Sequence, residues 1–214
     1  MKYVVGARGS KLSMAQTNWV ISELKKVNSD CEYEIKPITT KGDTDTRPLF
    51  TIEQKGIFEK EIDKAVAAKE IDFAVHSLKD VPSELADNLI IASIPKREKV
   101  NDVFISSDDS SLDKIKPGSV IGTSSLRRAV QISRQRSDVT VKPIRGNIET
   151  RINKTSGENY DAIVLAQAGI SRLGVDVNFT PLSVDDFSPS PGQGAIAIVA
   201  RTDDVQTIDM LKKI

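Results

Sequence analysis

Short apolar segments that fit buried strands alternate with amphipathic segments that fit helices along almost the whole chain. Tyr3–Ala7 predicts the first strand, and Leu12, Trp19 and Leu24 share one face of the helix expected after it. This alternation predicts an α/β fold in which parallel strands are covered by helices. Strands are expected at 3–7, 33–39, 71–77, 89–94, 103–106, 120–123, 139–143, 162–166 and 195–200, and helices at 12–27 and 57–69, from 126, from 147, after 169 and at the end of the chain.

Two polar segments interrupt the alternation, near 95–102 and at 188–194. Segments of this kind are typical of crossovers between domains. We expect domain 1 to consist of residues 1–96 together with 193–214, and domain 2 of residues 97–192. Each lobe is predicted to be a mixed, mostly parallel sheet with flanking helices, and a cleft between two such lobes is a common place for a ligand.

The composition excludes several classes of protein. The 214 residues include 30 Lys and Arg, 30 Asp and Glu, one His and one Cys, so neither an internal disulfide nor a structural zinc site can form. No apolar run approaches the roughly 18 residues that a membrane span needs. Met1–Gly6 enters a strand-like segment without a signal-peptide core. We therefore expect a cytoplasmic protein without a membrane partner or a bound metal.

The balanced total charge conceals a basic segment at 119–154, which carries eight Lys and Arg against two acidic residues. Arg127, Arg128 and Arg145 follow predicted strands at turns into helices, where free backbone N–H groups already favour anions. Arg134 and Arg136 are better read as a solvated basic face. Nucleic acid is a weak alternative ligand, since the segment contains no aromatic residue to stack bases. The pattern favours a small polyanion.

The second concentration of polar residues is Val75–Pro82, at the end of a predicted buried strand. Carboxyl ends of strands in open α/β sheets are the usual ligand-binding edge. Asp80 beside Lys79 has two readings: a local ion pair or turn residue, or a carboxylate that stabilises a cation formed in a reaction. His76 is most simply a satisfied strand residue.

Two further features are weaker. Residues 41–56 lack clear periodicity, which is typical of a long functional loop, and they lead to Lys55 and Phe58 at a predicted helix start. Val5–Leu12 and Ile121–Arg127 both read as a strand, a glycine, small residues and a basic helix start. This echo suggests two lobes that present similar helix N-termini to one ligand.

Taken together, these motifs resemble the porphobilinogen deaminase (hydroxymethylbilane synthase) family, in the family's order and approximate spacing. The matching segments are Arg8–Ser10, Lys55–Phe58, Val75–Pro82, Gly122–Arg128, Arg145–Asn147 and Gly192–Ala195.

The resemblance implies a two-lobed fold similar to type II periplasmic binding proteins, with a discontinuous domain 1. It implies an enzyme of tetrapyrrole (haem) biosynthesis that joins four porphobilinogen molecules head to tail into hydroxymethylbilane and releases ammonia. By resemblance, Asp80 is the catalytic carboxylate. The residues on the family's substrate- or cofactor-binding positions are Arg8, Ser10, Lys55, Phe58, Lys79, Ser124, Ser125, Arg127, Arg128, Arg145, Gly146, Asn147, Arg151 and Gln193.

The resemblance also implies a dipyrromethane cofactor, which the family holds through a cysteine on a small third domain. We expect that third domain to be absent from residues 1–214, and the one cysteine, Cys31, does not match the attachment loop. Two hypotheses follow. The chain is an enzyme that holds its primer in another way or is completed by a separate polypeptide, or it is a binding protein for pyrroles or other polyanions on the same scaffold.

Overall fold

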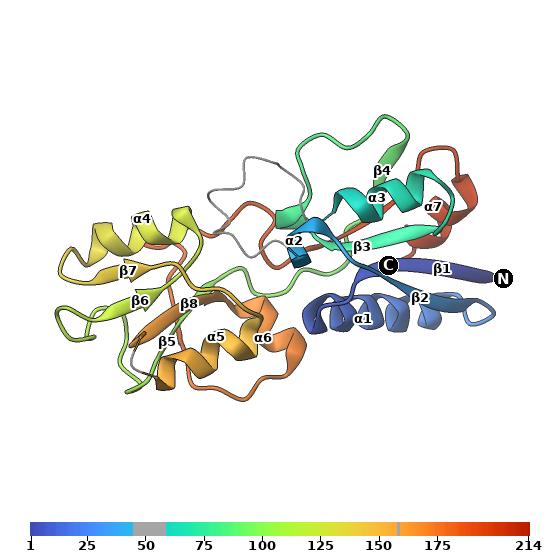
Figure 1. The fold of residues 1–214 in the computed structure, drawn as a ribbon. Coiled ribbons are helices and arrows are strands. Elements are labelled where there is room, and N and C mark those ends of the chain that lie inside the picture. The colour runs from blue at the N-terminus through green and yellow to red at the C-terminus, as the bar shows by residue number, and fades with distance from the viewer. Residues whose placement is uncertain (45–58, 158) are drawn as a thin grey trace. The chain divides into compact units, whose positions relative to one another are not determined.

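The computed structural model describes residues 1–44, 59–157 and 159–214, and these residues divide into two compact units. Unit 1 contains residues 1–44, 59–98 and 194–214, and unit 2 contains residues 99–157 and 159–193. Figure 1 colours the chain by residue number, and the red C-terminal segment belongs to the same unit as the blue N-terminal strands. Within the described ranges, no helix is long and apolar enough to cross a membrane.

Unit 1 is a five-stranded sheet with helices on its faces. Its strands are β1 (Lys2–Arg8), β2 (Glu32–Ile38), β3 (Phe73–Ser77), β4 (Leu89–Ser93) and β10 (Ile196–Arg201). Its helices are α1 (Lys11–Val27), α2 (Lys41–Thr44), α3 (Lys60–Ala67), the 3-10 turn η2 (Leu78–Asp80) and α7 (Val205–Leu211). The strand order is β2-β1-β3-β10-β4, and β10 is antiparallel to both of its neighbours.

Unit 2 is a second five-stranded sheet. Its strands are β5 (Asp102–Ser106), β6 (Val120–Gly122), β7 (Thr140–Lys142), β8 (Ala162–Ala166) and β9 (Thr180–Pro181). Its helices are α4 (Leu126–Gln135), α5 (Ile148–Asn153), the 3-10 turn η3 (Lys154–Ser156) and α6 (Gln167–Leu173). The strand order is β7-β6-β8-β5-β9, and β5 is antiparallel to both of its neighbours.

The two sheets therefore repeat one topology. Strands β1 and β6 each pair in parallel with both neighbours, while β10 and β5 fill the corresponding antiparallel position. The predicted α/β architecture of two mixed sheets with flanking helices is confirmed. Parallel and antiparallel pairings are equally frequent in each sheet, rather than mostly parallel, because β5 and β10 follow chain crossovers and enter their sheets from the opposite end.

The central strands of both sheets bury side chains on both faces, which explains why β3, β5, β8 and β10 are almost continuously apolar. In unit 1, Val5 and Phe73 pack with α1 and α7 on one face, while Ala74 packs with α3 on the other. In unit 2, Phe104 packs with α4, while Val103 lies in a second cluster with α5 and α6. The helices α1, α3, α4, α5, α6 and α7 are thus each held against a sheet by apolar contacts.

The similarity between the segments Val5–Leu12 and Ile121–Arg127 includes one glycine in each, and both glycines are closely packed. Gly6 in β1 and Gly122 in β6 occupy corresponding strands of the two sheets. A Cβ at Gly6 would lie 2.2 Å from Cδ1 of Ile71, and one at Gly122 would lie 2.9 Å from a ring carbon of Tyr160. Both strands need glycine because neighbouring side chains cross directly over the backbone.

Three local predictions differ from the structure. The helix expected from residue 57 begins at Lys60, and residues 57 and 58 lie outside the described ranges. The helix expected after Gly169 instead contains this glycine, which is buried inside α6, and the left-handed Gly174 ends the helix. Strand β9 was not predicted, because two residues ending in Pro181 are too short for a periodic signal.

Candidate functional site

A polar pocket lies in unit 1 at the carboxyl ends of β1 and β3. Asp80, Arg8 and Ser10 line it together. Because β1 and β3 are parallel neighbours, their carboxyl ends meet at one edge of the sheet. Asp80 closes the turn η2 directly after β3, and Ser10 follows β1 as the N-cap of α1. The sheet thus brings Asp80 together with Arg8 and Ser10, which lie 72 and 70 positions before it in the sequence.

The turn from β1 into α1 is held by two serines. The Ser10 hydroxyl accepts a hydrogen bond from the Ser13 N–H at 3.3 Å, and the Ser13 hydroxyl accepts one from the Arg8 N–H at 3.1 Å. This reciprocal arrangement satisfies N–H groups that a helix start leaves without partners. It fixes the backbone of the loop that carries Arg8 into the pocket.

Five further polar residues line this pocket and were not predicted as site residues: Ser13, Gln16, Glu59, His76 and Ser77. The Gln16 amide nitrogen lies 2.9 Å from the Ser77 hydroxyl, so α1 and the end of β3 are joined across the pocket wall. Nε2 of the buried His76 lies 3.1 Å from Oδ1 of Asp63 on α3. Gln16 is buried in α1 together with Ser13 and Thr17, and polar residues at positions that continue the apolar stripe of the helix are the sequence signal that could have identified it.

The remaining predicted residues of domain 1 are less informative. Lys79 is exposed beside Asp80 and is not among the residues that line the pocket. Lys55 and Phe58 lie outside the described residues. Cys31 is half-buried against the apolar core of unit 1 beside Tyr33.

In unit 2, two strand-to-helix turns carry the predicted anion-binding residues. Ser125 caps α4, where its hydroxyl accepts from the Arg128 N–H at 3.5 Å. Asn147 caps α5, and its side-chain oxygen accepts from the Thr150 N–H at 2.8 Å. Both cap residues therefore have a structural task besides the ligand binding predicted for them. Ser124 also stabilises this region, because its hydroxyl contacts the backbone of Ile144.

The turn before α5 is drawn together by side chains that reach back to its carbonyl groups. Nε of Arg151 donates to the Gly146 carbonyl at 2.7 Å, and the Lys154 ammonium donates to the Arg145 carbonyl at 3.0 Å. Gly146 has a φ of +115°, a conformation that favours glycine. The chain between β7 and α5 is thus fixed by contacts from the helix that follows it.

The direction of the pKa shift of Arg151 indicates positive charge around this turn. Partial burial lowers the pKa of its guanidinium, and the positive charges of Arg128 and Arg145 lower it further. Arg128 and Arg145 are therefore each close enough to Arg151 for their charges to repel it. A site with this excess of positive charge favours a bound anion, which would offset the repulsion.

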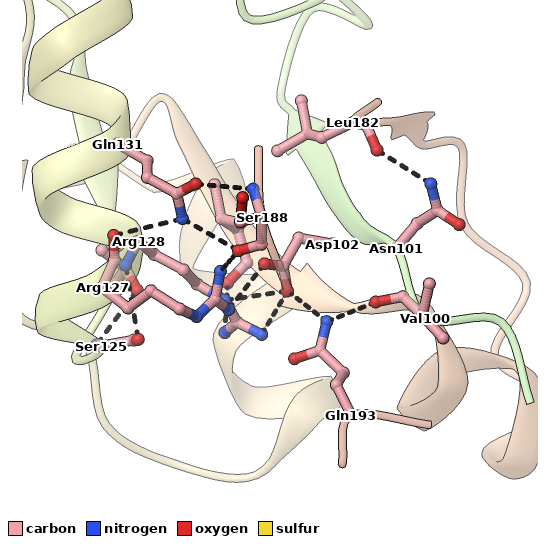
Figure 2. A network of polar contacts seen from close by, with 12 residues as sticks. Val100, Asn101, Asp102, Ser125, Arg127, Arg128, Gln131, Leu182, Ser188 and Gln193 are labelled. Carbon is pink, nitrogen blue, oxygen red and sulfur yellow. Dashed lines mark hydrogen bonds and ion pairs between the residues drawn. The ribbon is translucent and has the colours of Figure 1, made fainter. Parts of the chain in front are cut away.

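Arg127 and Arg128 both bind a carboxylate of the chain itself, as Figure 2 shows. Each guanidinium has a nitrogen 2.7 Å from an oxygen of the fully buried Asp102. The amide nitrogen of Gln193, also buried, donates to Asp102 at 3.0 Å and to the Val100 carbonyl at 2.7 Å. Sequence reasoning missed Asp102, although a charged residue that opens an apolar strand is itself an unusual signal.

The reading of Arg136 as part of a solvated basic face is wrong. Its guanidinium donates to the carbonyl oxygens of Leu112 at 2.6 Å and Ile115 at 2.7 Å, and it pairs with Asp138. Its side chain is only 14% exposed. Arg136 therefore stabilises the connection between β5 and β6, while Arg134 is exposed as predicted.

The comparison with protein families agrees with the motifs. Residues 3–209 match the family model described as "Porphobilinogen deaminase, dipyromethane cofactor binding domain". The chain belongs to the porphobilinogen deaminase family. The resemblance inferred from the sequence motifs is thereby confirmed.

Curated relatives of the porphobilinogen deaminase family are similar over the whole of this chain. A probable porphobilinogen deaminase from Nitrosopumilus maritimus is 82% identical over 214 residues, which are 100% of this chain and 69% of that protein. A porphobilinogen deaminase from Listeria innocua is 50% identical over 219 residues, covering 100% of this chain and 71% of the relative.

Solved structures with little sequence similarity share the fold. The methionine binding protein MetQ has a TM-score of 0.58 at 11% identity, over 99% of this chain and 89% of that one. A probable amino-acid ABC transporter extracellular-binding protein from Bacillus subtilis has a TM-score of 0.57 at 9% identity, over 100% and 89%. The predicted likeness of this porphobilinogen deaminase family member to periplasmic binding proteins is confirmed at the level of the fold.

The cofactor named for the family can be tested against the side chains present. Arg145 and Arg151, with Ser125 at the start of α4, form a set of cationic and hydroxyl donors suited to a group that carries carboxylates. The lowered pKa of Arg151 shows that this donor set has an excess of positive charge. These residues fit dipyrromethane. Within the described residues, no group of three or more His, Cys, Asp or Glu could hold a metal ion.

Proposed function

We propose that the chain is a hydroxymethylbilane synthase, which joins four porphobilinogen molecules head to tail and releases one ammonia for each unit added. The observation that carries this proposal is the cationic site at which Arg151 lies within reach of the positive charges of Arg128 and Arg145, in a chain of the porphobilinogen deaminase family. Porphobilinogen has an acetate and a propionate side chain, so a growing oligopyrrole is a polyanion that such a site would bind.

Each condensation breaks one bond between heavy atoms and forms another. The bond between the aminomethyl carbon and nitrogen of one porphobilinogen breaks, and that carbon bonds to a ring carbon of the next pyrrole. The ring carbon loses its proton, and the nitrogen departs as ammonia, so no oxidant or reductant is needed. Positive charge develops on the pyrrole while the nitrogen leaves, and a fixed carboxylate is the group that stabilises it.

Asp80 is the carboxylate we assign to that task. It lines the unit 1 pocket with Arg8 and Ser10, so a positive charge and a hydroxyl are available beside it for the substrate's own carboxylates. An ionised carboxylate also accepts hydrogen bonds from pyrrole N–H groups. Asp80 would therefore orient the ring and stabilise the charge that forms on it.

The other predicted residues serve binding in this proposal. Ser125, Arg145 and Arg151 would hold carboxylates of the cofactor and of the bound pyrroles. Ser124, Asn147 and Gly146 would keep the turn that carries Arg145 in shape. When bound, dipyrromethane supplies the pyrrole to which the first substrate unit is joined. Lys55, Lys79 and Phe58 remain predictions of the resemblance.

The decisive experiment uses the chain purified from cells that synthesise porphobilinogen. Intact mass and the Ehrlich colour reaction detect a retained pyrrole group, and incubation with porphobilinogen and preassembled primer tests for ammonia and hydroxymethylbilane. We expect both products. A bare mass, no colour and no product with added primer would contradict the enzyme and leave the binding-protein alternative.

Two finer statements belong to the same proposal. A cytoplasmic location stays a prediction. The same mass measurement identifies the polypeptide that supplies a cysteine for covalent attachment, because a thioether-linked group adds its mass to the polypeptide that carries it. It would also detect attachment to a separate polypeptide. Cys31 packs against the core of unit 1 and is not our candidate.

A further inference from the structure

Asp102 is a buried carboxylate at the first position of β5, directly before the apolar residues Val103 and Phe104. Its relative exposure is 0%. Side chains from two separate segments of unit 2 converge on it: Arg127 and Arg128 from α4, and Gln193 from the end of the unit. Figure 2 shows these contacts meeting at the one carboxylate.

The two carboxylate oxygens divide the donors unequally. Oδ1 accepts from Arg128 through Nε at 3.0 Å and Nη2 at 2.7 Å, and from the Gln193 amide at 3.0 Å. Oδ2 accepts from Nη2 of Arg127 at 2.7 Å. The remaining terminal nitrogen of Arg128 donates to the Val164 carbonyl at 3.1 Å, so all three of its nitrogens are held.

Arg127 is held at both terminal nitrogens, by Asp102 and by the Ser188 carbonyl, yet its side chain keeps 25% of its surface exposed. The Arg128 side chain keeps 9%. Gln131 on the next turn of α4 also binds the Ser188 backbone, both its N–H at 2.6 Å and its carbonyl at 3.1 Å. The orientation of Arg127 is therefore fixed from two sides.

Stability alone is a poor explanation for this arrangement. Two cations in the first turn of α4 oppose the helix dipole, which favours anions at that end. Buried ion pairs are commonly no more stabilising than well-packed apolar residues of similar volume. One carboxylate against two guanidinium groups also leaves an excess of positive charge, and the charge of Arg128 still reaches Arg151. The contacts to Asp102 therefore keep Arg127 and Arg128 at the start of α4, where the helix N-terminus already favours anions.

We propose that Asp102 is a positioning residue for carboxylate binding by unit 2: it fixes the guanidinium groups of Arg127 and Arg128 at the start of α4, so that the partly exposed Arg127 meets a pyrrole carboxylate in a preset orientation. Gln193 supports Asp102 from the opposite end of the unit. The inference rests on the proposed function, because the ligand is the polyanion named there.

One substitution distinguishes a positioning role of Asp102 from a purely electrostatic role, because the two roles predict opposite changes in affinity. Asp102→Asn removes a negative charge beside the arginines, so Coulomb's law by itself predicts tighter binding of an anion. Loss of a preset orientation predicts weaker binding. We expect the dissociation constant for porphobilinogen, measured by calorimetry on the full chain, to rise about tenfold in Asp102→Asn. Unchanged or tighter binding by a folded Asp102→Asn variant would overturn the proposal.

A matched control and a rescue variant complete the measurement. Asp138→Asn breaks the ion pair with Arg136, which lies at the C-terminal end of α4, opposite to the end that carries Arg127 and Arg128. This variant should leave the dissociation constant unchanged. Asp102→Glu restores the charge with one more methylene and should recover part of the lost affinity. If Asp102→Glu binds no better than Asp102→Asn, the carboxylate does not act through the arginines.

A failure of the enzyme proposal gives a different result. If the parent chain binds porphobilinogen but forms no product, the function fails while the binding comparison still tests Asp102. If neither Asp102 variant folds, the unmodified chain decides. The Nε–H of Arg128 should then exchange with water at least about tenfold more slowly than that of the exposed Arg134, by NMR. Equal exchange rates would overturn the proposal.

Discussion

The Ser124 hydroxyl binds both backbone groups of Ile144: it donates to the carbonyl at 2.6 Å and accepts from the N–H at 3.1 Å. Ser124 lies between β6 and α4, and Ile144 directly precedes Arg145 in the turn between β7 and α5. One hydroxyl therefore joins the two turns that carry the arginines of unit 2. The serine predicted to bind a ligand has a structural partner in the chain.

The first prediction concerns that hydroxyl. Ser124→Ala leaves the buried Ile144 N–H and carbonyl without this partner, so the free energy of unfolding should fall by about 1–3 kcal/mol in a urea titration. The KM for porphobilinogen should rise, because the two turns are no longer joined. Ser137→Ala, at an exposed position of the same unit, is the control and should change neither quantity. A Ser124→Ala variant as stable as the parent would contradict this account.

The second prediction tests the role of Asp80. Asp80→Ala should abolish hydroxymethylbilane formation, because the carboxylate that stabilises the developing positive charge is lost, while calorimetric binding of porphobilinogen largely remains. Asp87→Ala removes an exposed carboxylate from the segment between η2 and β4 and should retain the parent rate. An Asp80→Ala variant that turns over at the parent rate would remove Asp80 from the mechanism.

The third prediction concerns the backbone of the turn before α5. Gly146 has a φ of +115°, and a Cβ there would lie 2.7 Å from Cγ2 and 2.9 Å from Cβ of Thr150. Gly146→Ala should therefore lower the free energy of unfolding by about 1–3 kcal/mol and displace Arg145 from its position. Gly157→Ala is the matched control, since a Cβ there meets nothing closer than 3.8 Å and its φ is negative. Equal stabilities of the two variants in urea would contradict the prediction.

The fourth prediction concerns pH and tests the packing of unit 1. Burial of the ring, and then the neighbouring Cys31, raise the pKa of Tyr33 from 10.0 to about 12. Because folding favours the neutral phenol, its contribution to stability is complete below pH 10 and is lost as the pH rises toward 12. An ultraviolet titration should show one phenolate forming near the upper value, and Tyr33→Phe should remove that step. A step still present in Tyr33→Phe would assign it to another tyrosine.

Periodicity was enough to predict most elements, because it records which side chains are buried. The strand at β8 and the helix start of α4 follow from apolar runs and a capping serine that any reader of the sequence can find. The start of α6 was missed because the sequence alone does not distinguish a buried glycine inside a helix, such as Gly169, from a glycine that ends a helix, such as Gly174. Sheet order was equally hidden, since β10 reaches its place between β3 and β4 from the far end of the chain.

The sequence by itself determined the chemistry that this protein can offer: a basic segment with arginines at helix starts, a carboxylate after a buried strand, and motifs specific enough to indicate the family. These follow from local order, which is written in the chain. Only the tertiary structure decided which charges meet. Asp102 lies 25 residues before Arg127, and Gln193 lies 91 residues after Asp102, so no local pattern joins them. Their contact depends on how the strands of unit 2 are ordered, because burial forces each charged group to find a partner from whichever segment the sheet brings to it.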